Sequence, residues 1–468
     1  MSYNLLKATA FALFSCGSNF GYAQEITATP RLVISITIDK LGSDDISIDY
    51  SNLSENGLKL FLNKGLCYNN IEYKFSPADN SAVIASISTG TTPYNNGIIA
   101  NLWFDRNSTK IKSCVEDFNY QGVLTDENCS AENILTTTLS DELKYNTQKK
   151  GLVYSISPNK EFAILTAGHN ADGAYWINGK EGNWCTTTYY EKKIPNWVEK
   201  VNALKKKNTN KNNRTTDLAI ECIKSNFLGK DNITDLLYIE YEPDYRNKDN
   251  DEERNQFLRQ TDSNIKRLLS AIKENTSLDD VLFIITGTGH YSENENTSKL
   301  ERYPGGKFYI NRAADLLNMY LGAIYGTDKY VLGFCNNQIY LNTLLIDKKK
   351  IKTSEIAYYA KKFLRQCQGI NNVLYCDDIL IGESYNKNAY NIKNSGDIIV
   401  ETSPGWKIVN ENNDNIFNTS FSTFQTSIII YNSKINKKNI CQPTEISNII
   451  EHISKILKIR APNGCKRF

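Results

Sequence analysis

The chain has 468 residues, of which 40% are hydrophobic, so it is long enough to bury a large core. It carries 54 lysines and arginines against 52 aspartates and glutamates, which gives a formal net charge of +2. A charge this close to zero gives no indication of a nucleic-acid-binding protein or of a protein held on an acidic membrane surface.

The beginning of the chain predicts export. Lys7 precedes a short apolar run that is too short to span a bilayer, and small residues follow it. We therefore expect a signal peptide over residues 1–23 and a mature chain over residues 24–468. The alternative is a lipoprotein signal over residues 1–15, which makes Cys16 a lipid anchor. Both alternatives place the protein in the periplasm or at the outer membrane, and no later segment has transmembrane length without charges.

The cysteines favour disulfides. Ten of the eleven lie beyond the signal, and an even number in an exported chain is typical of paired cysteines. We expect Cys114 to pair with Cys129 and Cys367 with Cys376, since each pair closes a short loop. The alternative is that several are buried free thiols. The chain has no CxxC pair, which argues against a structural zinc knuckle.

Apolar, β-branched segments alternate with helical segments along the chain. This alternation predicts an α/β protein with a central, mostly parallel sheet flanked by helices. We expect strands over residues 31–39, 70–75, 151–156, 163–166, 235–241, 281–286 and 427–431, with a hairpin arm over 398–409. We expect helices over residues 58–63, 81–88, 130–146, 215–226, 255–273, 353–364 and 443–458.

Two positions in this pattern are candidates for binding or chemistry. Asp39 ends the first strand, and open α/β sheets bind ligands at the carboxyl ends of their strands. A strand-end aspartate that only caps the next turn is the alternative. Asp79 and Asn80 open the small-residue helix over residues 81–88, and Gly90 suits the left-handed position that ends it. Amide N–H groups at a helix N-terminus attract anions, so Asn80 occupies the place where a phosphate or a nucleophile belongs.

Residues 76–106 resemble the nucleophile segment of the alkaline phosphatase superfamily, and in particular its PafA-type members. The likeness continues at residues 167–176, at 461–465 and across essentially the whole mature chain. It implies an alkaline phosphatase-like fold with insertions near residues 170–215 and 300–415, the second of which forms a smaller subdomain. The matching residues in the nucleophile segment are Pro77, Ser86, Ile87, Thr89, Gly90, Pro93, Gly97, Ile98, Asn101 and Trp103.

The same resemblance implies that several catalytic positions have changed. The nucleophilic threonine falls on Asn80, whose amide is not a nucleophile at neutral pH. The lysine and arginine that hold the substrate phosphate fall on Asn159 and Glu161, and a glutamate repels a phosphate. Only Asp39, at a metal-ligand position, and Asn101 stay in register.

The metal positions have changed as well. The resemblance implies two zinc ions with about six protein ligands, three of them histidines. This chain has only three histidines, and we expect His169 to be a hydrogen-bonded structural residue. At the second zinc, the family's aspartate and histidine fall on Thr288 and Gly289. The remaining candidate ligands are Asp39, Asp79, Asp244 and His290.

The sequence therefore predicts an exported alkaline-phosphatase-fold protein that has lost phosphatase activity. We expect it to serve a binding or assembly role in the cell envelope, with a protein partner and without a cofactor. The alternative is a divergent metal-dependent phosphomonoesterase, phosphodiesterase or sulfatase-like hydrolase, which uses zinc and rebuilt ligands.

Overall fold

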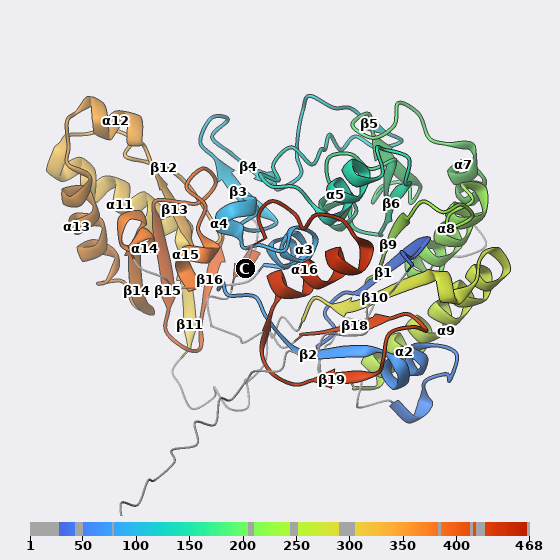
Figure 1. The fold of residues 1–468 in the computed structure, drawn as a ribbon. Coiled ribbons are helices and arrows are strands. Elements are labelled where there is room, and N and C mark those ends of the chain that lie inside the picture. The colour runs from blue at the N-terminus through green and yellow to red at the C-terminus, as the bar shows by residue number, and fades with distance from the viewer. Residues whose placement is uncertain are drawn as a thin grey trace, which may run out of the picture.

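A computed structural model describes residues 28–42, 50–76, 79–204, 210–243, 251–289, 305–381, 385–411, 415–417 and 426–465. It has two lobes, and the larger is built on an eleven-stranded sheet (Figure 1). The strand order is β19 (Lys438–Ile440), β2 (Leu66–Glu72), β18 (Thr426–Tyr431), β10 (Val281–Gly287), β1 (Leu32–Ile38), β9 (Asp235–Tyr241), β6 (Val153–Ile156), β7 (Gly173–Ile177), β8 (Trp184–Thr187) and β5 (Gly122–Val123), with β20 (Thr444–Glu445) paired to β2.

The middle of this sheet is parallel, as the apolar strand sequences predict. Ile36 of β1 lies opposite Ile285 of β10 on one side and Ile239 of β9 on the other. All seven residues of β1 are buried, which is the pattern of a strand covered on both faces. Antiparallel strands flank the parallel part, since β18 pairs antiparallel with both β10 and β2. The fold is therefore α/β with a large central sheet.

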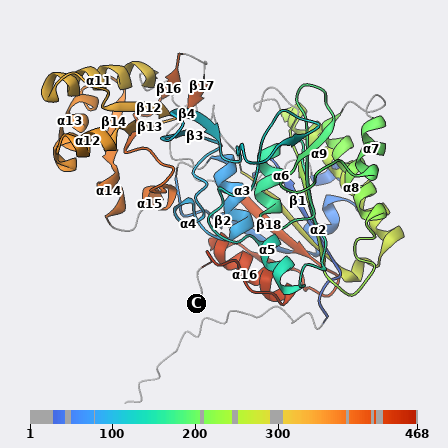
Figure 2. The same ribbon diagram turned by 90° about the horizontal axis from the view of Figure 1, so that it is seen from above.

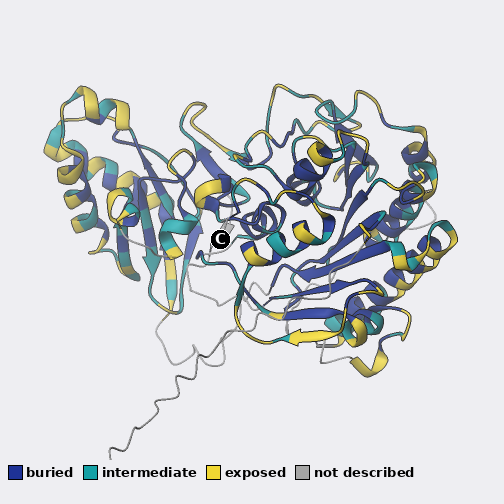
Figure 3. Cartoon of the chain, viewed as in Figure 1, coloured by how far each residue is buried: buried dark blue, intermediate teal, exposed yellow. Residues whose placement is uncertain are grey.

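Helices cover both faces of the sheet, and successive residues of β1 reach two separate cores. Val33 packs in the first core, whereas Leu32 and Ile34 pack in the second. Figure 2 shows the two layers of helices on opposite sides, and Figure 3 shows the buried strands between them. The first layer contains α3 (Asn80–Thr89), α5 (Leu139–Asn146), α6 (Lys160–Ala167) and α16 (Ile446–Leu457), and the second α2 (Leu58–Lys64), α7 (Asn196–Ala203), α8 (Lys211–Ser225) and α9 (Asp251–Asn275).

The smaller lobe has its own hydrophobic core. One sheet contains β11 (Gly306–Tyr309), β16 (Trp406–Asn410) and β17 (Asn415–Phe417); the other contains β12 (Val331–Cys335), β13 (Gln338–Leu341), β15 (Ile398–Thr402) and β14 (Ile370–Tyr375). Its helices are α11 (Ile310–Tyr325), α12 (Thr343–Lys348), α13 (Thr353–Leu364), α14 (Cys376–Leu380) and α15 (Tyr385–Ala389).

Two short elements of the larger lobe hold the smaller one. Helix α4 (Pro93–Asn96) contacts α15, and β3 (Leu102–Asp105), which pairs with β4 (Lys110–Ser113), contacts β12. Across this junction the rings of Phe104 and Tyr340 lie 5.2 Å apart, and Arg106 forms an ion pair of 3.1 Å with Asp397.

Four sequence predictions of local structure are wrong. Residues 163–166 belong to helix α6 and not to a strand, because Asn159 caps the helix by accepting hydrogen bonds from the N–H groups of Glu161 and Phe162. The helix expected from residue 130 begins only at Leu139, after the N-cap Thr138. The strand expected over 70–75 lies at β2, and the two parts of the expected hairpin arm, β15 and β16, belong to different sheets.

The expected disulfides are absent, and all ten cysteines of the described residues are free. Cys114 and Cys129 are both buried, and the charge of Glu161 acts on both thiols, but they form no disulfide. The thiols of the second expected pair differ in their contacts: that of Cys367 lies against the Phe363 carbonyl and that of Cys376 against Asp377. Among the helices of the described residues, none combines the length and the apolar character that a membrane span requires.

Candidate functional site

The N-terminus of helix α3 is held by Asp79. Its Oδ1 accepts hydrogen bonds from the N–H of Ser81 at 2.9 Å and from the N–H of Asn101 at 2.8 Å. The first of these caps the helix, and the second draws the segment before β3 against the same turn. Burial raises the pKa of Asp79 to about 6, and the charge of Glu161 adds to that rise. One carboxylate thus brings Asn80 and Asn101 together at the mouth of α3.

Asn80 and Asn101 both present an unpaired amide oxygen. Each Oδ1 atom is buried and has no hydrogen-bond partner within the described residues. Buried polar atoms are usually paired, so each of these two oxygens can still accept a hydrogen bond from ordered water or a ligand. The side chain at the mouth of α3 is an amide, which offers neither a nucleophilic oxygen nor a removable proton at neutral pH.

Asp39 lies at the carboxyl end of β1 and is 6% exposed. Its Oδ1 accepts a hydrogen bond of 2.7 Å from the hydroxyl of Thr288, and this hydroxyl accepts one of 2.8 Å from the Lys40 N–H. Burial raises the pKa of Asp39, and the Thr288 hydroxyl opposes that rise. The threonine therefore occupies one oxygen of the carboxylate and ties β1 to the end of β10.

Glu240 in strand β9 was not anticipated as a site residue. It is 1% exposed and accepts a hydrogen bond from the hydroxyl of Ser157, which in turn accepts one of 2.7 Å from the Asn159 N–H. Burial raises its pKa well above the ordinary value, with repulsion from Asp39 the next cause. Strand β9 contains two acids, Asp235 at its start and Glu240 near its carboxyl end, and an acid at the carboxyl end of a buried strand was the signal in the sequence that could have indicated Glu240.

Asn159 and Glu161, which align with the phosphate-binding lysine and arginine of PafA-type enzymes, make other contacts. The Asn159 side chain caps helix α6, and Glu161 Oε1 accepts a hydrogen bond of 2.9 Å from the Ser113 hydroxyl. Lys160 points to Glu127, with Nζ 2.7 Å from Oε1, and lies 4.0 Å from Glu161. Lys160 is therefore already paired with Glu127, which lies outside the group of acids at the mouth of α3.

Five acids share this edge of the sheet: Asp39, Asp79, Glu161, Glu240 and Glu242. Asp39, Glu242 and Glu161 each raise the pKa of Glu240, and Glu161 also raises that of Asp79, so these carboxyls share one electrostatic field, which the charge of Lys40 offsets in part at Asp39. A field of this sign repels a phosphate dianion and favours either protonated carboxyls or a bound cation.

The family model for type I phosphodiesterases and nucleotide pyrophosphatases matches residues 33–427. The chain belongs to this family. Alkaline phosphatase PafA from Elizabethkingia meningoseptica is 24% identical over 519 aligned residues, which cover 94% of each chain. A protein named calcium-transporting ATPase from Myroides odoratus is also 24% identical, over 534 aligned residues that cover 98% of this chain and 97% of the relative.

Solved structures agree with this membership at the level of the fold. The crystal structure of wild-type PafA aligns with a TM-score of 0.83 at 22% identity, covering 94% of this chain and 98% of that chain. A murine member of the family, ectonucleotide pyrophosphatase/phosphodiesterase 5, aligns with a TM-score of 0.55 at 13% identity. The predicted PafA-like fold is therefore confirmed.

The described residues do not fit the zinc pair that the resemblance to PafA-type enzymes implies. Thr288, at the position of a zinc-binding aspartate, donates its proton to Asp39 and is fully buried. Within the described residues, no three His, Cys, Asp or Glu side chains are grouped so that they could hold a metal. The candidates Asp244 and His290 lie outside the described residues.

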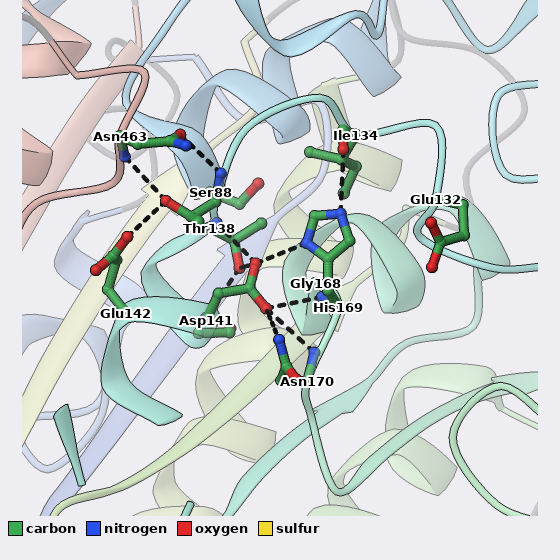
Figure 4. Close-up of polar contacts among 12 residues, drawn as sticks. Ser88, Glu132, Ile134, Thr138, Asp141, Glu142, Gly168, His169, Asn170 and Asn463 are labelled. Carbon is green, nitrogen blue, oxygen red and sulfur yellow. Dashed lines mark hydrogen bonds and ion pairs between the residues drawn. The ribbon is translucent and has the colours of Figure 1, made fainter. Parts of the chain in front are cut away.

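The other two histidines are used elsewhere. Figure 4 shows His169 between the Asp141 carboxylate, 2.8 Å from Nδ1, and the Ile134 carbonyl, 3.0 Å from Nε2. His452 on α16 lies 2.9 Å from the Tyr68 hydroxyl. Both rings are hydrogen-bonded within the scaffold, in agreement with the structural role expected for His169.

Proposed function

We propose that this PafA-like member of the family has lost phosphatase activity and serves as a binding protein of the cell envelope. The observation that carries the proposal is the mouth of α3, where the amide of Asn80 stands within a group of carboxylates. A phosphoryl-transfer site needs a nucleophile and positive charge around the phosphate. This edge of the sheet offers an amide and negative charge instead.

The proposal includes export and a protein partner. The signal-like N-terminus over residues 1–23, or the lipid anchor at Cys16, supports a place in the periplasm or at the outer membrane. The unpaired oxygens of Asn80 and Asn101 support a retained capacity to bind, because a purely structural site tends to pair its buried polar atoms.

A divergent hydrolase of phosphoric or sulfuric esters is the second candidate. Asp39 supports it, since it ends β1, where open α/β sheets bind ligands, and the pKa of Asp79, about 6, suits a general base near neutral pH. The curated relatives that carry the names alkaline phosphatase and calcium-transporting ATPase also favour a hydrolytic ancestor.

An assay of ester hydrolysis separates the two candidates. Purified protein is incubated with para-nitrophenyl phosphate, bis-para-nitrophenyl phosphate and para-nitrophenyl sulfate, each with added zinc, magnesium or calcium. We expect no turnover above that of an Asp39→Asn variant purified in parallel, which reports contaminating host phosphatase. Turnover that the Asp39→Asn substitution abolishes would overturn the proposal in favour of the hydrolase.

A further inference from the structure

The outermost helices of the smaller lobe carry apolar side chains that its core does not use. Helices α11 and α13 lie on the side of this lobe that is turned away from the larger lobe (Figures 1 and 2). One face of α11 packs in the core. A second apolar stripe on the same helix contains Leu316, Met319 and Ile324, of which Leu316 is 51% exposed and Met319 69%. A surface helix normally has one apolar face and a polar opposite face, so this second stripe indicates a surface that meets a partner.

Aromatic rings extend the exposed stripe from α11 to α13. Tyr320 stacks on Phe363 with ring centroids 5.2 Å apart, and it lies 6.4 Å from the ring of Tyr359. The ring of Tyr359 in turn lies 5.3 Å from that of Tyr358, which is 59% exposed. We call this continuous surface the outer patch, and its residues are Leu316, Met319, Tyr320, Ile324, Tyr358, Tyr359 and Phe363.

The segment that forms the outer patch is basic. Residues 310–365 contain nine of the chain's 54 basic residues but only four of its 52 acidic residues, so this segment carries +5 although the whole chain carries only +2. Three of the nine basic side chains form ion pairs: Arg312 with Glu411, Lys349 with Asp328, and Lys361 with Asp378. The other six make no ion pair with any part of the chain that the structure describes, and they are Lys329, Lys348, Lys350, Lys352, Lys362 and Arg365.

Three of these lysines lie where the two helices of the outer patch meet. Lys348, Lys350 and Lys352 are exposed and occupy the turn between α12 and α13, and α13 begins directly after them. Lys349 in the same turn has its Nζ 3.2 Å from the carbonyl of Tyr325, which is the last residue of α11. The turn is therefore fixed to the end of α11, so its exposed lysines border the apolar surface.

The charge of this surface selects among the partners that an apolar patch can meet. A second copy of the chain fits poorly, because a two-fold interface places the same patch on both sides and would bring the unpaired basic residues of both copies together. A partner that is apolar inside and negatively charged at its boundary fits well. A membrane of anionic phospholipids has this character, since its acyl chains lie beneath a layer of phosphate groups.

We propose that the outer patch docks the protein on an anionic phospholipid membrane. Leu316, Met319 and Tyr358 enter the boundary between the headgroups and the acyl chains, while the lysines of the turn over residues 348–352 stay among the lipid phosphates. This inference adds a membrane surface to the binding role proposed for the cell envelope. It rests on the smaller lobe alone, so it holds whether or not the site at the mouth of α3 hydrolyses esters.

Vesicle flotation tests the proposal on the mature chain, residues 24–468, which lacks Cys16 and therefore any lipid anchor at that position. The protein is mixed with vesicles of phosphatidylcholine alone, or of equal parts phosphatidylcholine and phosphatidylglycerol. We expect it to float with the anionic vesicles, to be released by high salt because salt screens the lysines, and to stay behind with phosphatidylcholine alone. Failure to float with the anionic vesicles, or equal flotation with both kinds, overturns the proposal.

Two matched sets of lysine substitutions locate the contact. Lys348→Gln, Lys350→Gln and Lys352→Gln together should weaken binding to the anionic vesicles about a hundredfold, since each basic residue near such a surface contributes a factor of about five. The control removes the same charge from three exposed lysines of the larger lobe and should leave the affinity nearly unchanged; its substitutions are Lys434→Gln, Lys437→Gln and Lys438→Gln. Equal weakening by both sets, or by neither, overturns the proposal.

The apolar part of the outer patch has its own test, because a purely electrostatic contact would not use it. Met319→Ser should weaken binding to the anionic vesicles without changing its dependence on salt, since the serine removes apolar area but no charge. Circular dichroism checks that the variant is folded. Sedimentation velocity of the free protein tests a second copy as the occupant, and we expect a monomer. Vesicle binding that Met319→Ser leaves unchanged, or a dimer that this substitution dissociates, overturns the proposal.

Discussion

Asn80 decides what the mouth of α3 can do, because a helix N-terminus concentrates positive potential on the first side chain it meets. An amide there can donate and accept hydrogen bonds, but it has no hydroxyl for a base or a metal to deprotonate. If this residue were the only obstacle to catalysis, a threonine would remove it. The surrounding acids argue that it is not.

We therefore predict that Asn80→Thr does not create an active phosphatase. The new hydroxyl would lie in the acidic surroundings of Asp79, Glu161 and Glu240. Positive charge is needed to activate a nucleophile and to bind the phosphate, and these residues do not provide it. Hydrolysis of para-nitrophenyl phosphate with added zinc should stay at the level of an Asn80→Ala control. Circular dichroism checks that both variants are folded. Zinc-dependent turnover by the threonine variant alone would show that the metal site had been misjudged.

Thr288 carries a structural prediction. Thr288→Val keeps the shape of the side chain but removes the hydroxyl that donates to Asp39 and accepts from the Lys40 N–H. Leaving these buried groups unpaired should lower the free energy of unfolding by about 1–3 kcal/mol. Urea denaturation measures the change, and Thr288→Ser, which restores the hydroxyl, is the control. A valine variant as stable as the wild type would mean that the Asp39 carboxyl is paired in another way.

For single residues, the sequence predicts a site position where the residue lies next to a recognisable strand end or helix start. It does not predict residues whose hydrogen-bond partners are distant in the chain. Asp39 and Asn80 could be placed because Asp39 follows a strand and Asn80 opens a helix, whereas Asn101 was placed only by the resemblance to the family. The hydrogen bond of Glu240 could not be predicted, since its partner Ser157 is 83 positions away. The contact of Thr288 with Asp39 joins residues 249 positions apart and likewise depends on the fold.

Helix α5 shows how local capping and a distant histidine fix one element. Thr138 and Asp141 form a capping box at its N-terminus, and the Asp141 carboxylate also accepts from His169 Nδ1 (Figure 4). Asp141 and the Ile134 carbonyl raise the pKa of His169 against the effect of burial, and the His169 contact lowers the pKa of Asp141. The pair is therefore most favourable when both groups are charged.

This pair predicts a pH-dependent contribution to stability. The pKa of His169 is raised in the folded state, so its contribution is full below the unfolded value of about 6.5 and is lost as the pH rises through the folded value. The lowered pKa of Asp141 gives a contribution that is lost only in acid. His169→Gln should therefore lower the free energy of unfolding more at pH 6 than at pH 9, a difference that urea denaturation at the two pH values can measure.

His452 provides a control, because its pKa is shifted in the opposite direction from that of His169. Burial, with the charge of Lys455 as a second cause, lowers its pKa, so protonation of the folded protein is unfavourable. Its neutral form contributes stability above the unfolded pKa, and that contribution falls as the pH drops. The cost of His452→Gln should accordingly shrink between pH 7 and pH 5, while the cost of His169→Gln should not. Parallel pH profiles for the two variants would contradict both assignments.

Element identity was predictable where length and residue type agreed. The β-branched runs of β1, β9 and β10 are strands, as expected, because each is long enough to cross the sheet and is buried on both faces. The strand predicted over residues 163–166 was wrong because a short apolar run does not distinguish a buried strand from a buried helix. The cap residue Asn159, four positions earlier, was the local signal for a helix.

The two ends of helix α3 face different surroundings. Its N-terminus meets the acids at the carboxyl edge of the parallel strands, whereas Gly90 at its C-terminus lines a cavity bordered by residues of both lobes. Motifs that belong to the scaffold survive along the whole chain, which is why the family fold could be predicted from sequence. Disulfides could not, because an even number of cysteines says nothing about whether folding brings any two of them together.

Metal content is a property of the whole chain and gives the sharpest test of the site. Zinc prefers nitrogen and sulfur ligands in a tetrahedral set, and a catalytic site supplies three protein ligands for each ion. Asp39 and Asp79 can supply only oxygen ligands, and one oxygen of Asp79 already accepts hydrogen bonds from two N–H groups. The Asp79 charge reaches the thiols of Cys114 and Cys335, and burial raises the pKa of both, which disfavours the thiolate that zinc requires. An oxygen-rich set of this kind suits calcium or magnesium better than zinc.

We predict that the protein, purified without a chelator and dialysed against zinc-free buffer, carries well under one zinc ion per chain. Elemental analysis by mass spectrometry measures the content, and a zinc-dependent alkaline phosphatase taken through the same dialysis is the control for metal lost in handling. The reason is the donor set: an amide at Asn80, an alcohol at Thr288 and a glycine at 289 stand where the resemblance implies a nucleophile and zinc ligands. Two tightly held zinc ions per chain would require ligands from the segments that contain Asp244 and His290. That result would make the divergent hydrolase the better account of this protein.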